Sequence, residues 1–584
     1  MTRTIDRRGL LRDAALAGGG LALGLPSTGW AQGASPGLAR NGADALPTVS
    51  GEAITLRIAR ETMRVDGRPS RAIGINGSAP GPLIRLREGQ DVAIHVVNAL
   101  DTDTSLHWHG LLVPFQYDGV PGISFPGIRP GTTFTYRFPV RQSGTYWYHS
   151  HSGGQEQEGL YGPIVIDPAA PDAIASDRDH IVMLSDHSQD SAAAIFRRMK
   201  LQPGYYNFQR QTLGGLLAGQ DQGAGERLDW GRMRMDPADI ADGTGATYSY
   251  LVNGRGPADN WTGLFRPGER VRLRVINAAA MTTFNVRIPG LRMTVVAADG
   301  LAVRPVGVEE FQIGVAETYD VIVTPTEDRA YTLVGESVDR SGMARATLAP
   351  RAGMVAPMPP LRPRPLATMT DMGMGGMAGM AGMDHMAMPG MDHGAMDHGA
   401  MDMRDFTAAP QVRKGPGVPT ISPMPVDRTG YPGQGLEDVG HRVLTYRDLV
   451  AQAQNPDVRA PGRQFDVHLT GNMERFMWSF DGVKMSDTHV PFAFTEGERV
   501  RVRLINDTMM AHPIHLHGHY FELVTGHGAY APRKHTVIVQ PGGIVCFDLT
   551  ADAVGDWAFH CHMLYHMLAG MMRVVSVRPR GDTA

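Results

Sequence analysis

The sequence predicts an all-β chain built from three β-sandwich domains with Greek-key connections. Many short apolar runs are separated by glycine, proline and aspartate, a pattern typical of sandwich strands. A glycine turn followed by a strand of alternating apolar and polar residues occurs three times, at 88–98, 267–277 and 496–506. The chain of 584 residues is long enough for about three or four domains, each with its own core.

The repeats divide the chain into domains. The segments 144–151 and 555–562 also match each other, so the first and third units share an ending that the second unit lacks. Residues 191–240 are poor in strand signals, and we expect loops and short helices there. The predicted division is a first domain at 48–168, a second domain at 175–350, a linker with a low-complexity tract at 351–435, and a third domain at 436–584.

The amino terminus has the pattern of an export signal. Arg7 and Arg8 precede an apolar run from Ala14 to Leu25, and Ala31 provides a small residue for cleavage. The run is too short to span a bilayer, and it is too uniformly apolar for an amphipathic helix. We therefore expect residues 1–31 to be a twin-arginine signal peptide. The mature protein is expected to be soluble in the periplasm, without membrane insertion after export.

Charge and cysteine content narrow the function. The net charge of -4 and the isoelectric point near 6.6 give no bulk attraction to nucleic acid, so nucleic-acid binding is not expected.

Cys546 and Cys561 are the only two cysteines. Cys546 lies in an apolar run, and we expect it to be inert core of a buried strand. No disulfide is expected, because a bridge would consume Cys561, whose neighbours indicate a metal ligand.

The strongest chemical signal lies near the carboxyl terminus. On an extended strand, Cys561 points to one face while His560 and His562 point to the other. His566 and Met571 follow in a predicted bend or short helix, from which they can return to the cysteine's side. Cysteine, histidine and a weak methionine ligand make up a blue-copper electron-transfer site that still needs one histidine. Taken alone, the segment is equally compatible with a core cysteine and two solvated histidines.

The remaining histidine clusters repeat one spacing. Each contains a His-x-His pair, and on a strand both members of a pair share a face. His512, which precedes one pair, is left over and can complete the blue site with Cys561, His566 and Met571. The four pairs supply eight imidazoles: His107 and His109, His149 and His151, His515 and His517, and His560 and His562.

These four segments, in this order and spacing, resemble the multicopper oxidases over about residues 50–580. The resemblance implies three cupredoxin-like domains holding four copper ions: one type 1, one type 2 and a type 3 pair. It also implies that one-electron oxidation of a substrate is coupled to four-electron reduction of dioxygen to water. The type 2 and type 3 coppers are expected between the first and third domains.

The resemblance also assigns ligands. The type 1 copper would take His512, Cys561 and His566, with Met571 as axial ligand and Met572 as the alternative. The type 2 copper would take His107 and His515. The type 3 pair would take His109, His149, His151, His517, His560 and His562. Cys561, His560 and His562 would also carry the electrons between the centres.

Asp118 matches the carboxylate that the family places near the type 2 water, and we expect it to supply protons. The alternative is a turn residue beside Gly119. Many relatives carry a second carboxylate shortly after the His-Cys-His segment, but Leu564 and Met567 fill those places here. Glu156, five residues after His151, is a candidate substitute.

A methionine-rich tract narrows the family. Between Met369 and Met403, twelve of thirty-five residues are methionine, and a Met-Asp-His unit recurs three times. Thioethers select Cu(I), and histidine with aspartate can add Cu(II) sites, so we expect additional copper there; the alternative is a flexible linker. With the twin-arginine signal and the 471–478 segment, the tract resembles the bacterial periplasmic copper resistance protein A family.

This resemblance implies oxidation of Cu(I) to Cu(II), sequestration of copper, or both. We therefore expect a periplasmic, monomeric oxidase that uses dioxygen and either Cu(I) or a small phenolic reductant, with periplasmic copper proteins as further partners. The alternative is a copper store or carrier whose oxidase activity is secondary. Met473, Met477 and Met485 are candidates for a Cu(I) docking site near the blue copper, against ordinary core packing. The sequence does not identify the natural reductant.

Overall fold

The computed structural model describes residues 46–374, 403–488 and 490–581. The predicted signal peptide and the middle of the methionine tract, 375–402, lie outside the described residues. Within the described ranges the chain folds into six β-sheets, two for each of three successive stretches, which we call the first, second and third units. The all-β prediction is confirmed, whereas the exact domain boundaries stay a prediction.

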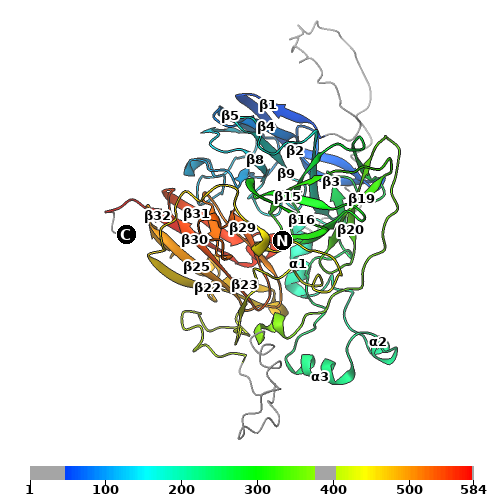
Figure 1. Ribbon diagram of the computed structural model, residues 1–584. Helices are drawn as coiled ribbons and strands as arrows, with labels where there is room; N and C mark the ends of the chain where they lie inside the picture. The colour runs from blue at the N-terminus through cyan, green and yellow to red at the C-terminus, as the bar shows by residue number, and fades with distance from the viewer. Residues whose placement is uncertain (1–45, 375–402, 489, 582–584) are drawn as a thin grey trace, which may run out of the picture. The chain divides into compact units, whose positions relative to one another are not determined.

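The first unit carries sheets of order β1-β4-β9-β8-β6 and β3-β2-β5-β7 (Figure 1). Trp108, Tyr136 and Tyr148 are fully buried in the core between them. Its strands are β1 (Thr48–Ser50), β2 (Ala53–Val65), β3 (Arg68–Ile75), β4 (Leu83–Arg87), β5 (Asp91–Asn98), β6 (His107–His109), β7 (Thr133–Pro139), β8 (Gly144–His149) and β9 (Tyr161–Asp167), with a 3₁₀ turn η1 (Phe115–Tyr117).

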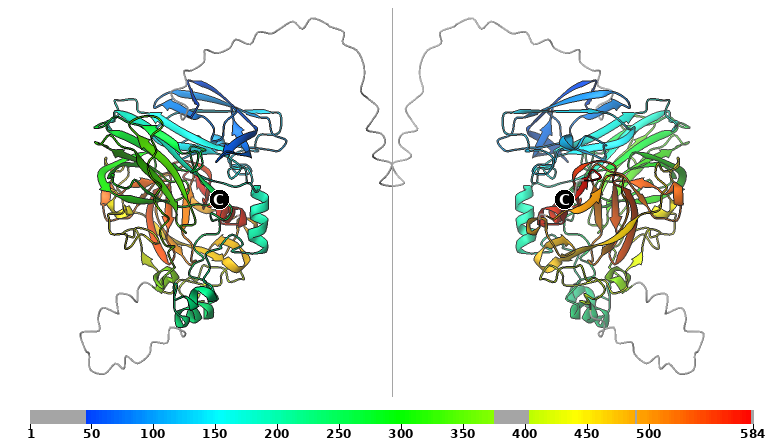
Figure 2. Two further views of the ribbon diagram at one scale, coloured as in Figure 1. Left: turned by 90° about the vertical axis from the view of Figure 1, so that its right-hand side faces the viewer. Right: turned by 90° about the vertical axis from the view of Figure 1, so that its left-hand side faces the viewer.

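The second unit carries sheets of order β11-β10-β13-β18-β15-β16 and β12-β20-β19-β14-β17. Its strands are β10 (Arg178–His187), β11 (Ser249–Val252), β12 (Trp261–Leu264), β13 (Val271–Asn277), β14 (Phe284–Arg287), β15 (Met293–Ala298), β16 (Leu301–Val308), β17 (Glu310–Ile313), β18 (Thr318–Val323), β19 (Tyr331–Ser337) and β20 (Met343–Ala349). The short helices predicted for 191–240 are α1 (Ala192–Leu201), α2 (Leu213–Leu217) and α3 (Ala224–Arg232), which lie outside the sheets (Figure 2). Ser191 and Thr212 begin α1 and α2, because their hydroxyls accept otherwise unpaired backbone amides.

The third unit carries sheets of order β23-β22-β25-β30-β27-β28, with β21 paired to β30, and β24-β32-β31-β26-β29. Its elements are β21 (Val426–Asp427), β22 (Arg463–Asn472), β23 (Met477–Phe480), β24 (Phe492–Thr495), β25 (Arg499–Asn506), β26 (His512–Leu516), β27 (Phe521–Leu523), β28 (Arg533–Lys534), β29 (Thr536–Val539), β30 (Gly543–Thr550), β31 (Gly555–Cys561), α4 (Leu564–Ala569) and β32 (Met572–Arg578). Cys546 is a free thiol in β30 but is only half-buried, because it lies on the strand face that alternates away from the core. The expectation that it is core was wrong.

The threefold repeat has a local physical cause. Strands β5, β13 and β25 each follow a glycine with positive φ, at Gly89, Gly268 and Gly497, where a side chain would strain the turn. Each strand ends in an asparagine whose side-chain amide donates to two backbone carbonyls later in the chain and accepts one backbone amide. In every unit, therefore, the central strand begins after the same glycine turn and ends at an asparagine that makes the same hydrogen bonds.

The second and third units share one continuous apolar core. A buried ion cluster also joins them: the Nζ atom of Lys534 lies 3.0 Å from Asp299 Oδ1 and 3.2 Å from Glu317 Oε1, and all three side chains are fully buried. Asp299 Oδ2 accepts the backbone amides of His535 and Thr536, each at 3.2 Å. The second unit thereby holds the start of β29, which lies against the histidine clusters. No helix within the described residues is long and apolar enough to cross a bilayer.

Candidate metal centres

Three predicted ligands of the blue site converge. The Sγ atom of Cys561, at the end of β31, lies 3.6 Å from Nδ1 of His512 and 3.9 Å from Nδ1 of His566, and the two nitrogens are 3.2 Å apart. His512 begins β26, and His566 lies in α4, the predicted short helix. Met571 follows this helix, is fully buried, and accepts the Cys561 amide at its carbonyl (3.1 Å). Met572, the alternative axial residue, is half-buried.

The outward nitrogens of the two histidines are held by partners that the sequence did not indicate. Nε2 of His512 lies 2.8 Å from the hydroxyl of Thr508, and Nε2 of His566 lies 2.7 Å from Asp242 Oδ2. Trp478 stacks on the ring of His566 with centroids 3.9 Å apart. Each Nδ1 is therefore left to face the thiol, the orientation that a shared metal ion requires.

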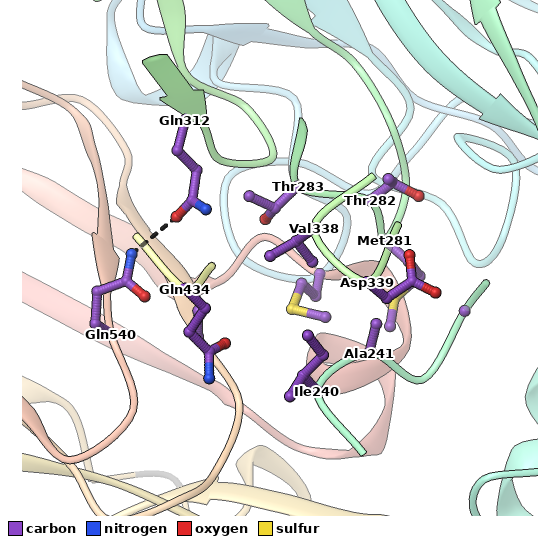
Figure 3. Close-up of a pocket in the computed structure, with 13 residues that line it drawn as sticks. Ile240, Ala241, Met281, Thr282, Thr283, Gln312, Val338, Asp339, Gln434 and Gln540 are labelled. Carbon is purple, nitrogen blue, oxygen red and sulfur yellow. Dashed lines mark hydrogen bonds between the residues drawn. The ribbon is translucent and has the colours of Figure 1, made fainter. Parts of the chain in front are cut away.

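A small pocket lies where the loops of the blue site meet the second unit. Its lining includes Ile240 and Ala241, next to Asp242 in sequence, and Ala511, next to His512. Gln312 and Gln540 close another side through a hydrogen bond of 2.8 Å (Figure 3).

Burial raises the pKa of Asp242 to about 7 and lowers the pKa of His566 to about 3. The imidazole is neutral at neutral pH and can bind a metal ion.

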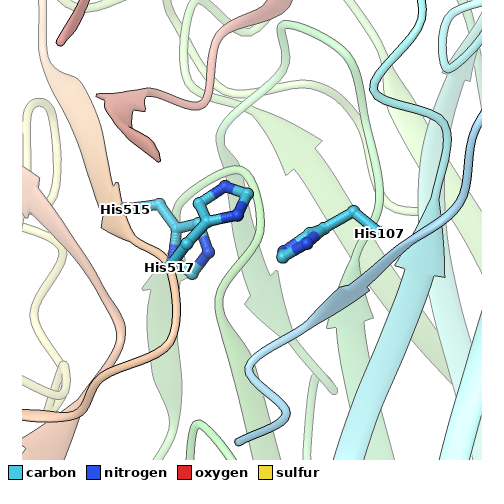
Figure 4. Close-up of side chains that lie close together, drawn as sticks. All are labelled: His107, His515 and His517. Carbon is cyan, nitrogen blue, oxygen red and sulfur yellow. The ribbon is translucent and has the colours of Figure 1, made fainter. Parts of the chain in front are cut away.

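The eight paired histidines also converge, at strand ends from the first and third units. His107 and His149 are opposite each other on β6 and β8, and His515 and His560 are opposite on β26 and β31. His107 extends toward His515 and His517 from the other side of the site (Figure 4). Each ring of the first unit contacts one of the third: the ring centroids are 3.9 Å apart for His107–His517 and His109–His515, 4.9 Å for His149–His562 and 5.1 Å for His151–His560.

The nitrogen atoms of these rings fit metal ions. Nε2 of His560 lies 3.1 Å from Nε2 of His517 and 3.4 Å from Nε2 of His151, close enough for one ion to bind all three. An unpaired buried nitrogen costs about 1–3 kcal/mol, which metal coordination would offset. Six further buried nitrogens have no hydrogen-bond partner among the described residues: Nε2 of His107, His149, His515 and His562, and Nδ1 of His109 and His562.

The pKa values of the paired histidines also favour metal binding. Metal binding requires neutral imidazole. Burial, reinforced by repulsion from neighbouring histidines, lowers the pKa of most of the cluster well below the usual value, and burial lowers that of His560 to about 4. The cluster residues whose pKa is lowered well below the usual value are His109, His149, His151, His515, His517 and His562.

Asp118 lies in the cluster, directly after η1. Its Oδ2 atom is 2.9 Å from Nδ1 of His517, and its backbone carbonyl accepts Nδ1–H of His107 at 2.7 Å. The side chain is fully buried. The carboxylate thus hydrogen-bonds His517 of the third unit, and its Oδ1 atom lies 3.3 Å from Nδ1 of His107 of the first, which suits a group that orients ligands and exchanges protons beside them.

Besides Thr508, three side chains near the centres were missed by sequence reasoning: Asp242, His535 and Thr536. Each comes from a loop or strand start without a repeated motif, and each contacts histidines hundreds of residues away or across a sheet. The Lys534-His535-Thr536 run offered one weak signal, an additional histidine near the third cluster.

Comparison with known proteins identifies the family. Sequence models of the multicopper oxidases match residues 57–171, 221–352 and 459–581. A copper resistance protein A homolog of Pseudomonas syringae pv. tomato is 49% identical over 93% of this chain and 96% of the relative. The chain belongs to the multicopper oxidase family. It is therefore an oxidoreductase with copper cofactors, which uses dioxygen and a reducing substrate, and the prediction of three cupredoxin-like domains is confirmed.

Other relatives agree with this family. Copper resistance protein A of Escherichia coli is 47% identical over 91% of this multicopper oxidase and 93% of the relative. Multicopper oxidase MmcO of Mycobacterium tuberculosis is 32% identical over 97% and 96%. Among solved structures, the laccase from Botrytis aclada has a TM-score of 0.62 at 21% identity, covering 91% of this chain and 88% of the laccase, and it supports the fold alone.

Proposed function

We propose that this multicopper oxidase is a periplasmic copper resistance enzyme that oxidises Cu(I) to Cu(II) and reduces dioxygen to water. The observation that carries the proposal is the convergence of Cys561, His512 and His566 beside a cluster of methionines. Copper bound by the predicted ligands, four ions in all, would take single electrons from the reductant and deliver four to dioxygen. Relatives named copper resistance protein A support the role in copper resistance.

The chain itself connects the two centres. Cys561 is the covalent neighbour of both His560 and His562, and Nδ1 of His560 donates to the Cys561 carbonyl at 3.0 Å. The path from the thiol to either histidine therefore crosses one short stretch of backbone. The alternation of a β-strand sends the thiol and the two imidazoles to opposite faces, so one strand can serve both centres.

The methionine cluster supports Cu(I) as the electron donor. The cluster consists of seven methionines from five separate segments of the described chain, and thioether sulfur is the side-chain ligand that favours Cu(I). Met235, Met372 and Met509 line one small pocket together with Thr508, whose hydroxyl contacts His512. The members are Met233, Met235, Met372, Met374, Met403, Met473 and Met509.

The expected trio of docking methionines is thus only partly supported. Met473 joins the cluster, whereas Met477 and Met485 do not belong to it. The ends of the methionine tract, through Met372, Met374 and Met403, contribute in their place. Together with Met473, they lie near Thr508, whose hydroxyl is the hydrogen-bond partner of His512.

Removing the pocket thioethers is expected to weaken Cu(I) oxidation selectively. The double variant Met372→Leu, Met509→Leu keeps side-chain volume but loses two sulfur atoms. We expect KM for Cu(I) to rise by about tenfold or more, equivalent to about 1.4 kcal/mol of lost binding, while phenol oxidation stays unchanged. Oxygen uptake with each reductant measures both, and Met358→Leu, at an exposed methionine, is the control. An unchanged KM for Cu(I) would remove the cluster from the substrate route.

The second candidate function, copper storage, is tested by deleting 375–402. This deletion spares Met372, Met374 and Met403, which pack in the cluster. For the oxidase, we expect copper bound beyond the four predicted ions to fall while Cu(I)-dependent oxygen uptake persists. Copper per chain and oxygen uptake measured on the same sample separate the two functions. Unchanged extra copper would make the tract a linker, and loss of the oxidase together with the extra copper would favour storage.

A further inference from the structure

The eight histidines form four pairs across the first and third units, and in three pairs one buried oxygen group lies behind both rings. Asp118 does so for His107 and His517. The other two groups are Glu156, which the sequence singled out only as a candidate substitute for a missing carboxylate, and Thr536, which it did not single out. The fourth pair, His151 and His560, makes a direct nitrogen contact at 3.4 Å.

Glu156 contacts the second pair. Its Oε2 atom lies 2.8 Å from Nδ1 of His149, and its Oε1 atom lies 3.9 Å from Nδ1 of His562. The side chain is 3% exposed, and neither Oε1 nor Nδ1 of His562 has a hydrogen-bond partner among the described residues. With Nδ1–H of His149 donating to the carboxylate, Nε2 of the same ring is the nitrogen left free for a metal ion.

Thr536 contacts the third pair. Its Oγ1 atom lies 3.2 Å from Nε2 of His109, 3.2 Å from Nδ1 of His515 and 3.1 Å from Nδ1 of His535. A hydroxyl donates one hydrogen bond and accepts two. It can therefore accept from the ring of His109, share the Nδ1–H of His515 with the His535 carbonyl at 2.7 Å, and donate to the ring of His535. This leaves Nδ1 of His109 and Nε2 of His515 free, and both lack another partner among the described residues.

The three nitrogens around Thr536 are themselves close enough to suggest a metal site, since His109, His515 and His535 form a compact group. The hydroxyl, however, already lies within hydrogen-bond distance of all three. Thr536 is held there from the second unit, because Asp299 accepts its backbone amide at 3.2 Å. The three histidines are therefore held by hydrogen bonds to the Thr536 hydroxyl, and the nitrogens facing it do not form a metal site.

We propose that Glu156 and Thr536 are positioning residues that complete, with Asp118, a set of three bridging oxygen groups. Each group holds the tautomer and ring orientation of at least one histidine and lies within 3.9 Å of a ring nitrogen from the other outer unit, so the two halves of the cluster are held in register before copper binds. The inference rests on the proposed ligand assignment. Removing a hydrogen-bond partner of a metal-binding histidine typically lowers metal affinity or activity by about 10–100-fold.

The test for Thr536 compares Thr536→Val with Thr536→Ser. Valine keeps the shape and loses the hydroxyl, whereas serine keeps the hydroxyl. After dialysis against a graded chelator, we expect the valine variant to lose copper from the histidine cluster at about 10–100-fold lower chelator strength, with an altered type 2 EPR spectrum and an unchanged blue absorption. The serine variant should match the wild type. Thr347→Val, which removes a buried hydroxyl bonded to Asn260 in the second unit, is the control.

The test for Glu156 compares Glu156→Leu with Glu156→Gln in the same dialysis. Leucine removes both oxygens, while glutamine keeps an acceptor for the ring of His149. We expect the leucine variant to lose type 3 copper first, with its blue absorption intact, and the glutamine variant to retain copper within about threefold of wild type.

The outcomes separate this inference from the function on which it rests. A wild-type protein holding fewer than four coppers after loading would overturn the ligand assignment itself. If the wild type holds four, then wild-type copper retention in Thr536→Val and Glu156→Leu overturns the bridging role, as does equal loss in the serine and valine variants. Should the valine variant not fold, Thr536→Ala against Thr536→Ser carries the same comparison.

Discussion

Replacing Cys561 by serine is expected to abolish both the blue absorption and oxygen uptake. The serine hydroxyl does not ionise near neutral pH, so no anionic ligand would remain between His512 and His566, and no sulfur would lead to the backbone of His560 and His562. Burial raises the pKa of the Cys561 thiol, which means that copper must displace its proton on binding. Copper uptake at this site should therefore release a proton and strengthen as pH rises.

The second cysteine provides a matched control for this change. Cys546 lies half-buried in β30, outside the predicted ligand set, and Cys546→Ser should keep the blue absorption and the rate of oxygen uptake. Visible spectra and oxygen uptake of both variants, loaded with copper in parallel, give the comparison. Blue colour in the Cys561→Ser protein, or its loss in the Cys546→Ser protein, would contradict the assignment of the thiolate.

Replacing Asp118 by asparagine is expected to slow oxygen turnover by about 10–100-fold while the blue absorption persists. The amide is neutral and cannot exchange a proton with the surroundings of His107 and His517. The type 1 ligands do not contact Asp118, and electron entry should be untouched. Steady-state oxygen uptake and the rate at which the blue band bleaches under reductant separate the two steps.

An exposed carboxylate of the first unit serves as control for that experiment. Asp101 forms a surface ion pair with Arg60, which is exposed on both sides, and Asp101→Asn should change neither rate. If Asp118→Asn consumes oxygen at the wild-type rate, the residue is a turn residue beside Gly119 and takes no part in proton supply.

Motifs that repeat within one strand were predictable from the sequence. The alternation around Cys561 and the His-x-His spacing are properties of neighbouring residues, and the structure brings these residues together at strand ends. The central strands were equally readable, because a glycine and a terminal asparagine mark each one. The all-β class followed from those strands.

Groups that act from a distance were not predictable. Thr536 meets His109 across 427 positions of sequence, and Asp242 meets His566 across 324. No local pattern distinguishes such a threonine or aspartate from any other turn residue. The seven clustered methionines illustrate the same point, since only packing of the tract ends against α3 and the third unit reveals which sulfur atoms meet. The spacing of residues in the sequence identifies the predicted metal ligands. The residues that hydrogen-bond those ligands are set by tertiary contacts, which the sequence does not reveal.

The pairing of rings from opposite units has a practical consequence for producing the protein. A fragment ending after the first unit would present four imidazoles to solvent, and a fragment of the third unit would do the same, so neither could build half of a working cluster. The number of copper ions bound per chain therefore reports whether the first and third units have docked. In a preparation whose first and third units have not docked, we expect the histidine cluster to stay empty even where the blue copper binds.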